Sequence, residues 1–190
     1  FLESKELLQT ITAETEKINE DARQLIAGLS EEQLNWKPAA DRWSIAQCFD
    51  HLAVTSQEFD PFFTDAIERG RQKWPVSGAV RYRPTWLGGW LINQLLPEAT
   101  RKVRTPKVFR PSDASAIHGA FEKFLRQQEV FLRFVGEAAG LDYNKTRLRS
   151  PASPLLRYSL ADAFVMTVVH GRRHLSQAGR VRKEPGFPAV

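Results

Sequence analysis

The sequence predicts an all-α fold, a four-helix bundle with a long crossover between its second and third long helices. Four segments carry apolar residues at intervals of three and four positions, the period of a helix with one buried face. Serines suited to capping helix N-termini precede several of the helical segments. A region rich in proline and glycine separates the second long segment from the third. The length of 190 residues suits one domain over residues 1–190.

The first long helix is expected over roughly residues 2–28, and it is followed by a short helix. The apolar face of the long helix carries Leu7, Ile11, Ile18, Leu25 and Leu29. Ser30 and Gln33 fit a capping box, in which each side chain bonds the other residue's backbone N–H. Trp36-Lys-Pro38 then ends the short helix.

The second long helix begins at Ser44, directly after Trp43, and runs to about residue 69. Its inner face carries Ile45, Cys48, Leu52, Thr55, Phe59 and Phe63. Residues 70–111 are expected to form the crossover, with one short helix near 86–95. Connections of this length in compact domains are usually functional or mobile.

The third long helix is expected from Pro111 to about residues 136–140, and the fourth from Ser159 to about Arg182. Ser159 would cap the fourth helix, with Asp162 complementing the helix dipole in its first turn. Residues 140–158 are expected to be irregular because no segment of the chain alternates convincingly as a strand.

The composition predicts a soluble globular protein in the cytoplasm. Hydrophobic residues make up 42% and charged residues 26% of the chain, as in ordinary globular domains. The longest apolar run, around residues 86–96, is too short for a transmembrane segment. The single cysteine, Cys48, excludes an intrachain disulfide and favours an intracellular location. An exposed apolar face of the bundle would favour a homodimer.

Positive charge is concentrated in one segment, residues 69–110, which we call the basic segment. It holds seven arginines and three lysines against Glu98, a net charge of +9, whereas the remaining residues carry −4. Its aromatic residues are Trp74, Tyr82, Trp86 and Trp90. Such a mixture can contact nucleic acid or an anionic membrane surface. We favour instead a lid over a site, whose charges would attract an anionic thiol.

Two histidines, His170 and His174, lie four positions apart in the last predicted helix. That spacing places both rings on one helical face, in the row that also holds Ala163 and Thr167. Arg172 and Arg173 would then point to solvent. Buried imidazoles need hydrogen bonds or a metal ion, so the pair is either a satisfied part of the core or two metal ligands.

The other two histidines differ in their expected positions. His51 borders the core face of the second helix beside Leu52, so its ring can point inward. His118 lies nearer the polar boundary of the third helix, on the flank of Ala114 and Glu122, and is expected to be partly exposed.

Three motifs of the chain together resemble those of the DinB-like superfamily. They are Trp36-Lys-Pro38, Trp43-Ser-Ile-Ala-Gln-Cys-Phe-Asp-His51-Leu-Ala, and His170-Gly-Arg-Arg-His174-Leu-Ser-Gln. The resemblance implies a four-helix bundle with its long connection between the second and third helices. It also implies a metal-binding triad of His51, His170 and His174, with no role for His118. The length and basicity of the basic segment exceed the family pattern.

Three neutral imidazoles suit a divalent transition metal, with Zn²⁺ or Ni²⁺ favoured and Fe²⁺ or Cu²⁺ also compatible. Three protein ligands leave a coordination position open, as in catalytic sites. Such an ion can activate water for hydrolysis or convert a bound thiol to a thiolate. Some members of the family that the chain resembles are thiol S-transferases. We therefore expect transfer of a low-molecular-weight thiol to a small-molecule electrophile, and hydrolysis as the second reaction.

Two further interpretations remain at this stage. A protein without catalytic activity could bind metal alone, or bind nucleic acid or another anionic surface through the basic segment. No acid has the spacing of a general base, although Asp50, Glu58 and Asp162 could support the site from behind. A surface charge or a helix cap is the more ordinary role of such acids. Cys48, one turn before His51, is expected to be a small buried hydrophobe.

Overall fold

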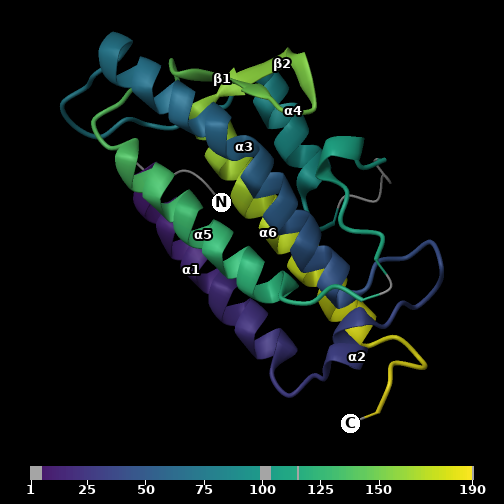
Figure 1. Ribbon diagram of the computed structural model, residues 1–190. Helices are drawn as coiled ribbons and strands as arrows, with labels where there is room; N and C mark the ends of the chain where they lie inside the picture. Colours follow the sequence, from purple (N-terminus) through teal and green to yellow (C-terminus); the bar gives the residue numbers. More distant parts are fainter. Residues whose placement is uncertain (1–5, 99–103, 115, 190) are drawn as a thin grey trace.

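A computed structural model describes residues 6–98, 104–114 and 116–189 of the chain (Figure 1). The described chain is mostly helical, in agreement with the predicted class. Its helices are α1 (Leu7–Ile26), α2 (Glu31–Asn35), α3 (Ile45–Lys73), α4 (Trp86–Leu95), α5 (Ala120–Glu137) and α6 (Leu160–Arg182). One 3₁₀ turn, η1 (Lys107–Phe109), and two strands, β1 (Arg147–Ser150) and β2 (Ser153–Ser159), complete the elements. Residues 2–5 of the first predicted helix lie outside the described residues.

The four long helices α1, α3, α5 and α6 lie side by side (Figure 1). Helix α3 packs against α5 and α6, and α1 packs against the same two helices. The ring of Phe63 on α3 lies 5.4 Å from that of Phe134 on α5 and 5.5 Å from that of Phe164 on α6. All three side chains are buried, and aromatic burial of this kind dominates core energetics. This packing fixes α3 against α6.

The predicted capping serines are confirmed at three helix starts. Ser30, Ser44 and Ser159 each accept a hydrogen bond from the backbone N–H three residues later. The residues at those positions, Gln33, Gln47 and Asp162, bond back to the serine N–H. These reciprocal bonds satisfy N–H groups that a helix start leaves unpaired, which explains why α2, α3 and α6 begin where they do.

The connection between α3 and α5 contains α4, at the bounds predicted for its short helix, and α4 packs against α6. The buried carboxylate of Asp162 accepts hydrogen bonds from the Tyr82 hydroxyl at 2.8 Å and the Thr85 hydroxyl at 2.7 Å. Gly88 passes so close that a Cβ on it would lie 2.2 Å from this carboxylate. The first turn of α4 is therefore fastened to the start of α6.

The third long helix begins later than predicted. It starts at Ala120, after Gly119 with φ of +65°, instead of at Pro111. The backbone N–H of Ser112 donates to Asp50 on α3, and that of Ile117 donates to Asn35 on α2. These side chains accept hydrogen bonds from N–H groups of the segment before α5 and hold that segment across the ends of α2 and α3. The start signal at Pro111 was therefore a wrong prediction.

The expectation of an irregular segment over residues 140–158 was also wrong, because β1 and β2 form an antiparallel hairpin. Leu148 and Tyr158 face each other across the strands and are buried. Arg149 and Arg157 form the next pair and are exposed. The alternation escaped detection because β1 has only four residues and Pro154 interrupts the pattern of β2.

None of the helices in the described ranges is both long enough and apolar enough to cross a membrane.

Candidate metal centre

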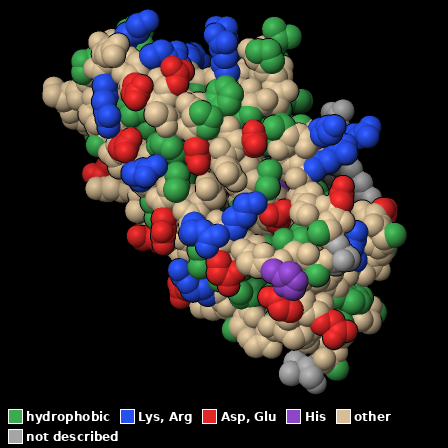
Figure 2. Space-filling view, in the orientation of Figure 1, with side chains coloured by type: hydrophobic (Ala, Val, Ile, Leu, Met, Phe, Trp, Pro, Cys, Tyr) green, Lys and Arg blue, Asp and Glu red, His purple; other side chains and the backbone are tan. Residues whose placement is uncertain are grey.

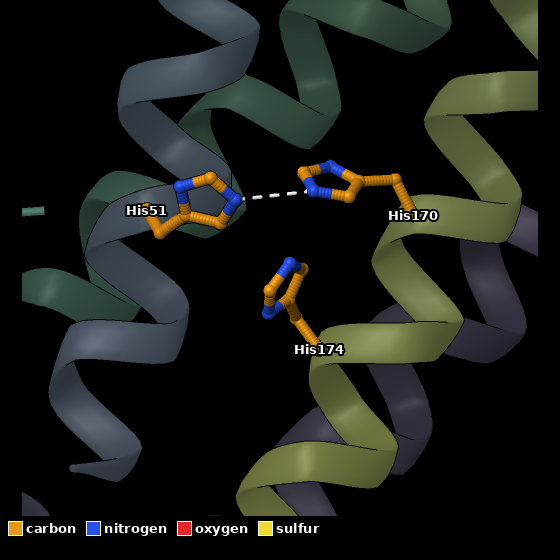
Figure 3. Close-up of side chains that lie close together, drawn as sticks. All are labelled: His51, His170 and His174. Carbon is orange, nitrogen blue, oxygen red and sulfur yellow. Dashed lines mark hydrogen bonds between the residues drawn. The ribbon is translucent and has the colours of Figure 1, made fainter. Parts of the chain in front are cut away.

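Three histidines from two helices meet between α3 and α6 (Figure 3). His51 comes from α3, and His170 and His174 come from α6. The Nε2 atoms of His51 and His170 are 3.1 Å apart, and one ring nitrogen from each histidine lies within 4.8 Å of the others. In Figure 3 a nitrogen of each ring points into the space between the three rings. The structure thus brings together the three histidines that the sequence singled out.

Local helical geometry explains how the rings converge. Ser44 starts α3, so His51 lies in the second turn of that helix, where α3 packs against α6. On α6 the spacing of four stacks His170 and His174 on the face turned toward α3. His51 is 3% exposed and His174 is 7% exposed, whereas His170 is half-buried. The cluster is therefore enclosed except on the side of His170.

The ring of His51 is oriented by a backbone carbonyl. Its Nδ1–H donates to the carbonyl oxygen of Phe109 in η1, with 2.5 Å between the two atoms. With the proton on Nδ1, the neutral ring keeps a lone pair on Nε2, which faces His170. Histidines that bind metals are commonly fixed in this way through their second nitrogen. Nothing in the sequence signalled this contact, because a backbone carbonyl carries no residue signature.

His174 has a buried ring nitrogen whose hydrogen-bonding capacity is unused. Its Nδ1 makes no hydrogen bond within the described residues. Most buried polar atoms in folded proteins have a partner, and an unpaired one raises the free energy of the fold. This unpaired nitrogen favours a metal-binding interpretation over that of three satisfied core histidines.

All three rings are held in the neutral form. Burial lowers the pKa of His51 to about 4, against an upward effect of its bond to Phe109. Burial also lowers the pKa of His170 and of His174 well below the ordinary value, and the neighbouring histidines add to the decrease. A metal ion competes with protons for imidazole, so neutral rings at pH 7 are ready to accept one.

An indole ring covers the cluster. The ring centroid of Trp43 lies 4.8 Å from that of His51 and 5.6 Å from that of His174, stacked on His174 at an angle of 27°. The sequence indicated Trp43 only as part of a helix start. Its contact with both helices could not be read from the chain, because it depends on how α3 and α6 pack.

The three acids considered as supporting residues lie outside the cluster. Asp50 accepts hydrogen bonds from the Ser112 N–H at 2.8 Å and from Lys123 at 3.2 Å. Asp162 holds the first turn of α4, and Glu58 is half-buried on α3. Among the described residues no carboxylate joins the histidine group. Asp162 has the expected role of a helix cap, whereas Asp50 is buried and is neither a surface charge nor a cap.

Cys48 and His118 also lie outside the cluster. Cys48 is 1% exposed, and burial raises the pKa of its thiol to about 12, so it stays protonated as a small core residue. His118 is exposed, as expected, but it precedes α5 and does not lie within that helix. Its Nδ1 lies 3.1 Å from a carboxylate oxygen of Glu31.

The prediction that Arg172 and Arg173 point to solvent was incomplete, because both side chains have protein partners. Arg172 pairs with Glu14 on α1. Arg173 donates to the backbone carbonyl oxygens of Leu96 at 2.7 Å and Gln94 at 3.4 Å, at the end of α4. Both arginines therefore fasten neighbouring elements to α6 on either side of the histidines.

Comparison with known protein families supports the resemblance seen in the sequence. A sequence model of the DinB superfamily matches residues 14–178, a range that includes all three clustered histidines. The chain belongs to the DinB superfamily. This family is metal-binding, and the histidine cluster could hold a metal ion. No curated protein and no solved structure matched the chain.

Proposed function

We propose that His51, His170 and His174 of this DinB-superfamily protein bind one divalent transition-metal ion within a four-helix bundle. The observation that carries the proposal is the convergence of three neutral ring nitrogens from α3 and α6. Ligand nitrogens around a tetrahedral ion with bonds of about 2.1 Å lie roughly 3.4 Å apart. The separation of 3.1 Å between the His51 and His170 nitrogens is close to that value. Zn²⁺ or Ni²⁺ is favoured, with Fe²⁺ as a third candidate.

We infer further that the centre is catalytic and that its substrate is a low-molecular-weight thiol. A bound ion would supply a Lewis acid that lowers the pKa of a thiol placed beside it. In the transfer, the thiol loses its proton to solvent, its sulfur bonds to an electrophilic carbon, and the leaving group departs with its bonding electron pair. Three neutral histidines leave the positive charge of an ion uncompensated, which favours an anionic sulfur ligand.

Residues around the histidines would orient the ligands, exclude water and leave one side open to a substrate. Phe109 orients His51, and Trp43 shields two of the three rings from water. His170 remains half-buried, so a substrate would approach from its side. Hydrolysis ranks second because none of the described carboxylates lies in the cluster to act as a general base.

The basic segment supports the lid interpretation through three hydrogen bonds. Thr85 and Tyr82 bond Asp162 at the start of α6, and the carbonyl of Phe109 bonds His51. A segment tied to both histidine-bearing helices suits a cover for a small-molecule site. Metal binding without catalysis, and nucleic-acid or anionic-surface binding through this segment, are the alternatives. The cytoplasmic location and the homodimer stay predictions.

A thiol-transfer assay tests the catalytic proposal. The purified protein is stripped with a chelator, reloaded with Zn²⁺ or Ni²⁺, and mixed with cysteine or glutathione and a fluorogenic alkylating reagent. We expect conjugation above the uncatalysed rate only for the reloaded protein and not for His170→Ala. The matched control, His118→Ala, should retain the rate because His118 is exposed and outside the cluster. Equal rates for stripped and reloaded protein would contradict the proposal, and a panel of ester substrates tests the hydrolase alternative.

A further inference from the structure

The outward face of the β1–β2 hairpin carries only positive charge. Arg147 and Arg149 on β1 and Arg157 on β2 are all exposed, and Arg149 lies directly opposite Arg157. None of the three side chains has an acidic partner within the described ranges. Like charges directly opposite each other destabilise a strand pair. An anion bound on this face would remove that repulsion.

Two large apolar side chains are exposed on the hairpin and on the helix that contacts it. Leu155 on β2 is 88% exposed, and Trp86 at the start of α4 is 86% exposed. Helix α4 contacts β2, and the bonds of Thr85 to Asp162 hold the start of α4 next to the end of that strand. In Figure 2, Lys and Arg side chains gather along the edge that the hairpin occupies in Figure 1. We call Arg147, Arg149, Leu155, Arg157 and Trp86 the hairpin surface.

We propose that the hairpin surface docks the protein onto an anionic lipid bilayer. Arginines near a bilayer bind the phosphates of anionic lipids. Tryptophan and leucine enter the boundary between headgroups and acyl chains, where apolar burial adds to the attraction. The surface combines both kinds of side chain at one end of the molecule.

Two other occupants of the hairpin surface are disfavoured. A second copy docked across a two-fold axis through this surface would bring Arg149 and Arg157 against the same arginines of its partner, and that contact is repulsive. Nucleic acid would pair with the arginines and could stack on Trp86. It has no use for an aliphatic side chain such as Leu155, which is the most exposed large hydrophobe on the strands.

Vesicle co-sedimentation tests the docking. The full chain is mixed with vesicles of phosphatidylcholine alone and with vesicles containing an equal part of phosphatidylglycerol. We expect binding to the anionic vesicles only, weakened by added salt. Since each arginine near the surface contributes about 1 kcal/mol, Arg149→Gln with Arg157→Gln should bind about 30-fold more weakly. Leu155→Gln should also weaken binding, and Trp86→Gln should remove a blue shift of tryptophan emission on vesicle addition.

A matched control distinguishes the effect of this surface from the effect of the protein's net charge. Arg23→Gln with Arg126→Gln removes the same charge from exposed positions on α1 and α5, away from the hairpin, and should bind vesicles like the wild type. An equal loss of vesicle binding in both double variants would overturn the proposal that the hairpin surface contacts the bilayer. Binding of the protein to a DNA or RNA duplex in a gel-shift experiment, without binding to anionic vesicles, would also overturn the proposed membrane docking. Because none of the substituted residues belongs to the histidine cluster, metal content should stay unchanged in every variant.

Discussion

Asp162 and His174 lie on the same helix, α6, and both are buried, yet their polar atoms differ in their hydrogen bonding. Both oxygens of Asp162 accept hydrogen bonds, from Tyr82, Thr85 and the backbone N–H of Ser159. The Nδ1 of His174 is buried and makes no hydrogen bond within the described chain. His51 and His170 contact each other through their Nε2 atoms at 3.1 Å, and among the described residues no acid joins their cluster.

The comparison sets a polar cluster that is satisfied by protein partners against the proposed binding site. A polar group retained for stability is satisfied by protein partners, because an unsatisfied one costs free energy. The Asp162 cluster meets that requirement and fastens α4 to α6. In the histidine cluster the Nδ1 of His174 does not meet it, and this supports the proposal that the cluster binds a ligand. The following predictions test this contrast, from the largest effect to the smallest.

Replacing Asp162 should give the largest loss of stability. Asp162→Ala leaves the hydroxyls of Tyr82 and Thr85 and the N–H of Ser159 without their acceptor. We expect the free energy of unfolding to fall by about 3–5 kcal/mol, measured by urea denaturation. Asp113→Ala, at an exposed position, is the control and should change it by less than about 0.5 kcal/mol. A decrease in the free energy of unfolding of less than about 1 kcal/mol for Asp162→Ala would contradict the structural role of this cluster.

Acid should destabilise the metal-free protein through His51. The folded-state pKa of about 4 lies below the unfolded value of 6.5, so the unfolded chain binds more protons between these values. Stability should therefore be fully present above pH 6.5 and fall as pH drops toward 4, by on the order of 3 kcal/mol for His51 alone. His170 and His174 shift in the same direction.

The contribution of His51 is isolated by comparing wild type with His51→Leu across this pH range. Asp60 acts in the opposite direction, because burial raises its pKa to about 6 and its protonation favours the fold in acid. Since Asp60 is present in both proteins, the difference between their pH profiles reports His51. Parallel profiles between pH 6.5 and 4 would show that His51 is not held neutral by the fold.

Adding one methyl group to α4 should loosen its attachment to α6. The Cβ of Gly88→Ala would lie 2.2 Å from the Asp162 carboxylate, so α4 must shift and its bonds to Asp162 must weaken. We expect a loss of about 1–3 kcal/mol in thermal or urea unfolding. Gly89→Ala is the matched control, because its Cβ meets only Pro84 at 3.7 Å and alanine favours a helix. Equal effects at the two positions would contradict the close packing at Gly88.

Replacing His174 should have the smallest effect on the stability of the metal-free protein. His174→Leu removes a buried nitrogen that has no partner and keeps an apolar side chain in the space. We expect a change within about 1 kcal/mol of wild type in either direction, in contrast to Asp162→Ala. Urea unfolding in the presence of a chelator measures it. A loss as large as that of Asp162→Ala would mean that the histidines are structural.

The sequence predicted features that depend on local spacing. The serine caps at Ser44 and Ser159 set the helix starts, and the four-residue spacing places His170 and His174 on one face. The inward position of His51 was also predictable, because the apolar period of its helix fixes which side is buried.

Features that depend on contacts between distant segments were missed. The carbonyl of Phe109 that orients His51 and the ring of Trp43 over His174 come from tertiary packing. The start of α5 was misplaced because Asp50 and Asn35, both far away in sequence, bond the segment before it. The hairpin was missed because a four-residue strand such as β1 gives too short an alternation to identify.

Metal stoichiometry tests the central claim most directly. Elemental analysis of the purified protein after loading with Zn²⁺ or Ni²⁺ should find one ion per chain in the wild type and in His118→Ala. His51→Ala, His170→Ala and His174→Ala should each lose it, and in the wild type the loaded ion should change the emission of Trp43, whose ring lies on two of the histidines. The account is contradicted if the wild type retains no stoichiometric metal, or if the three triad variants retain it as fully as His118→Ala.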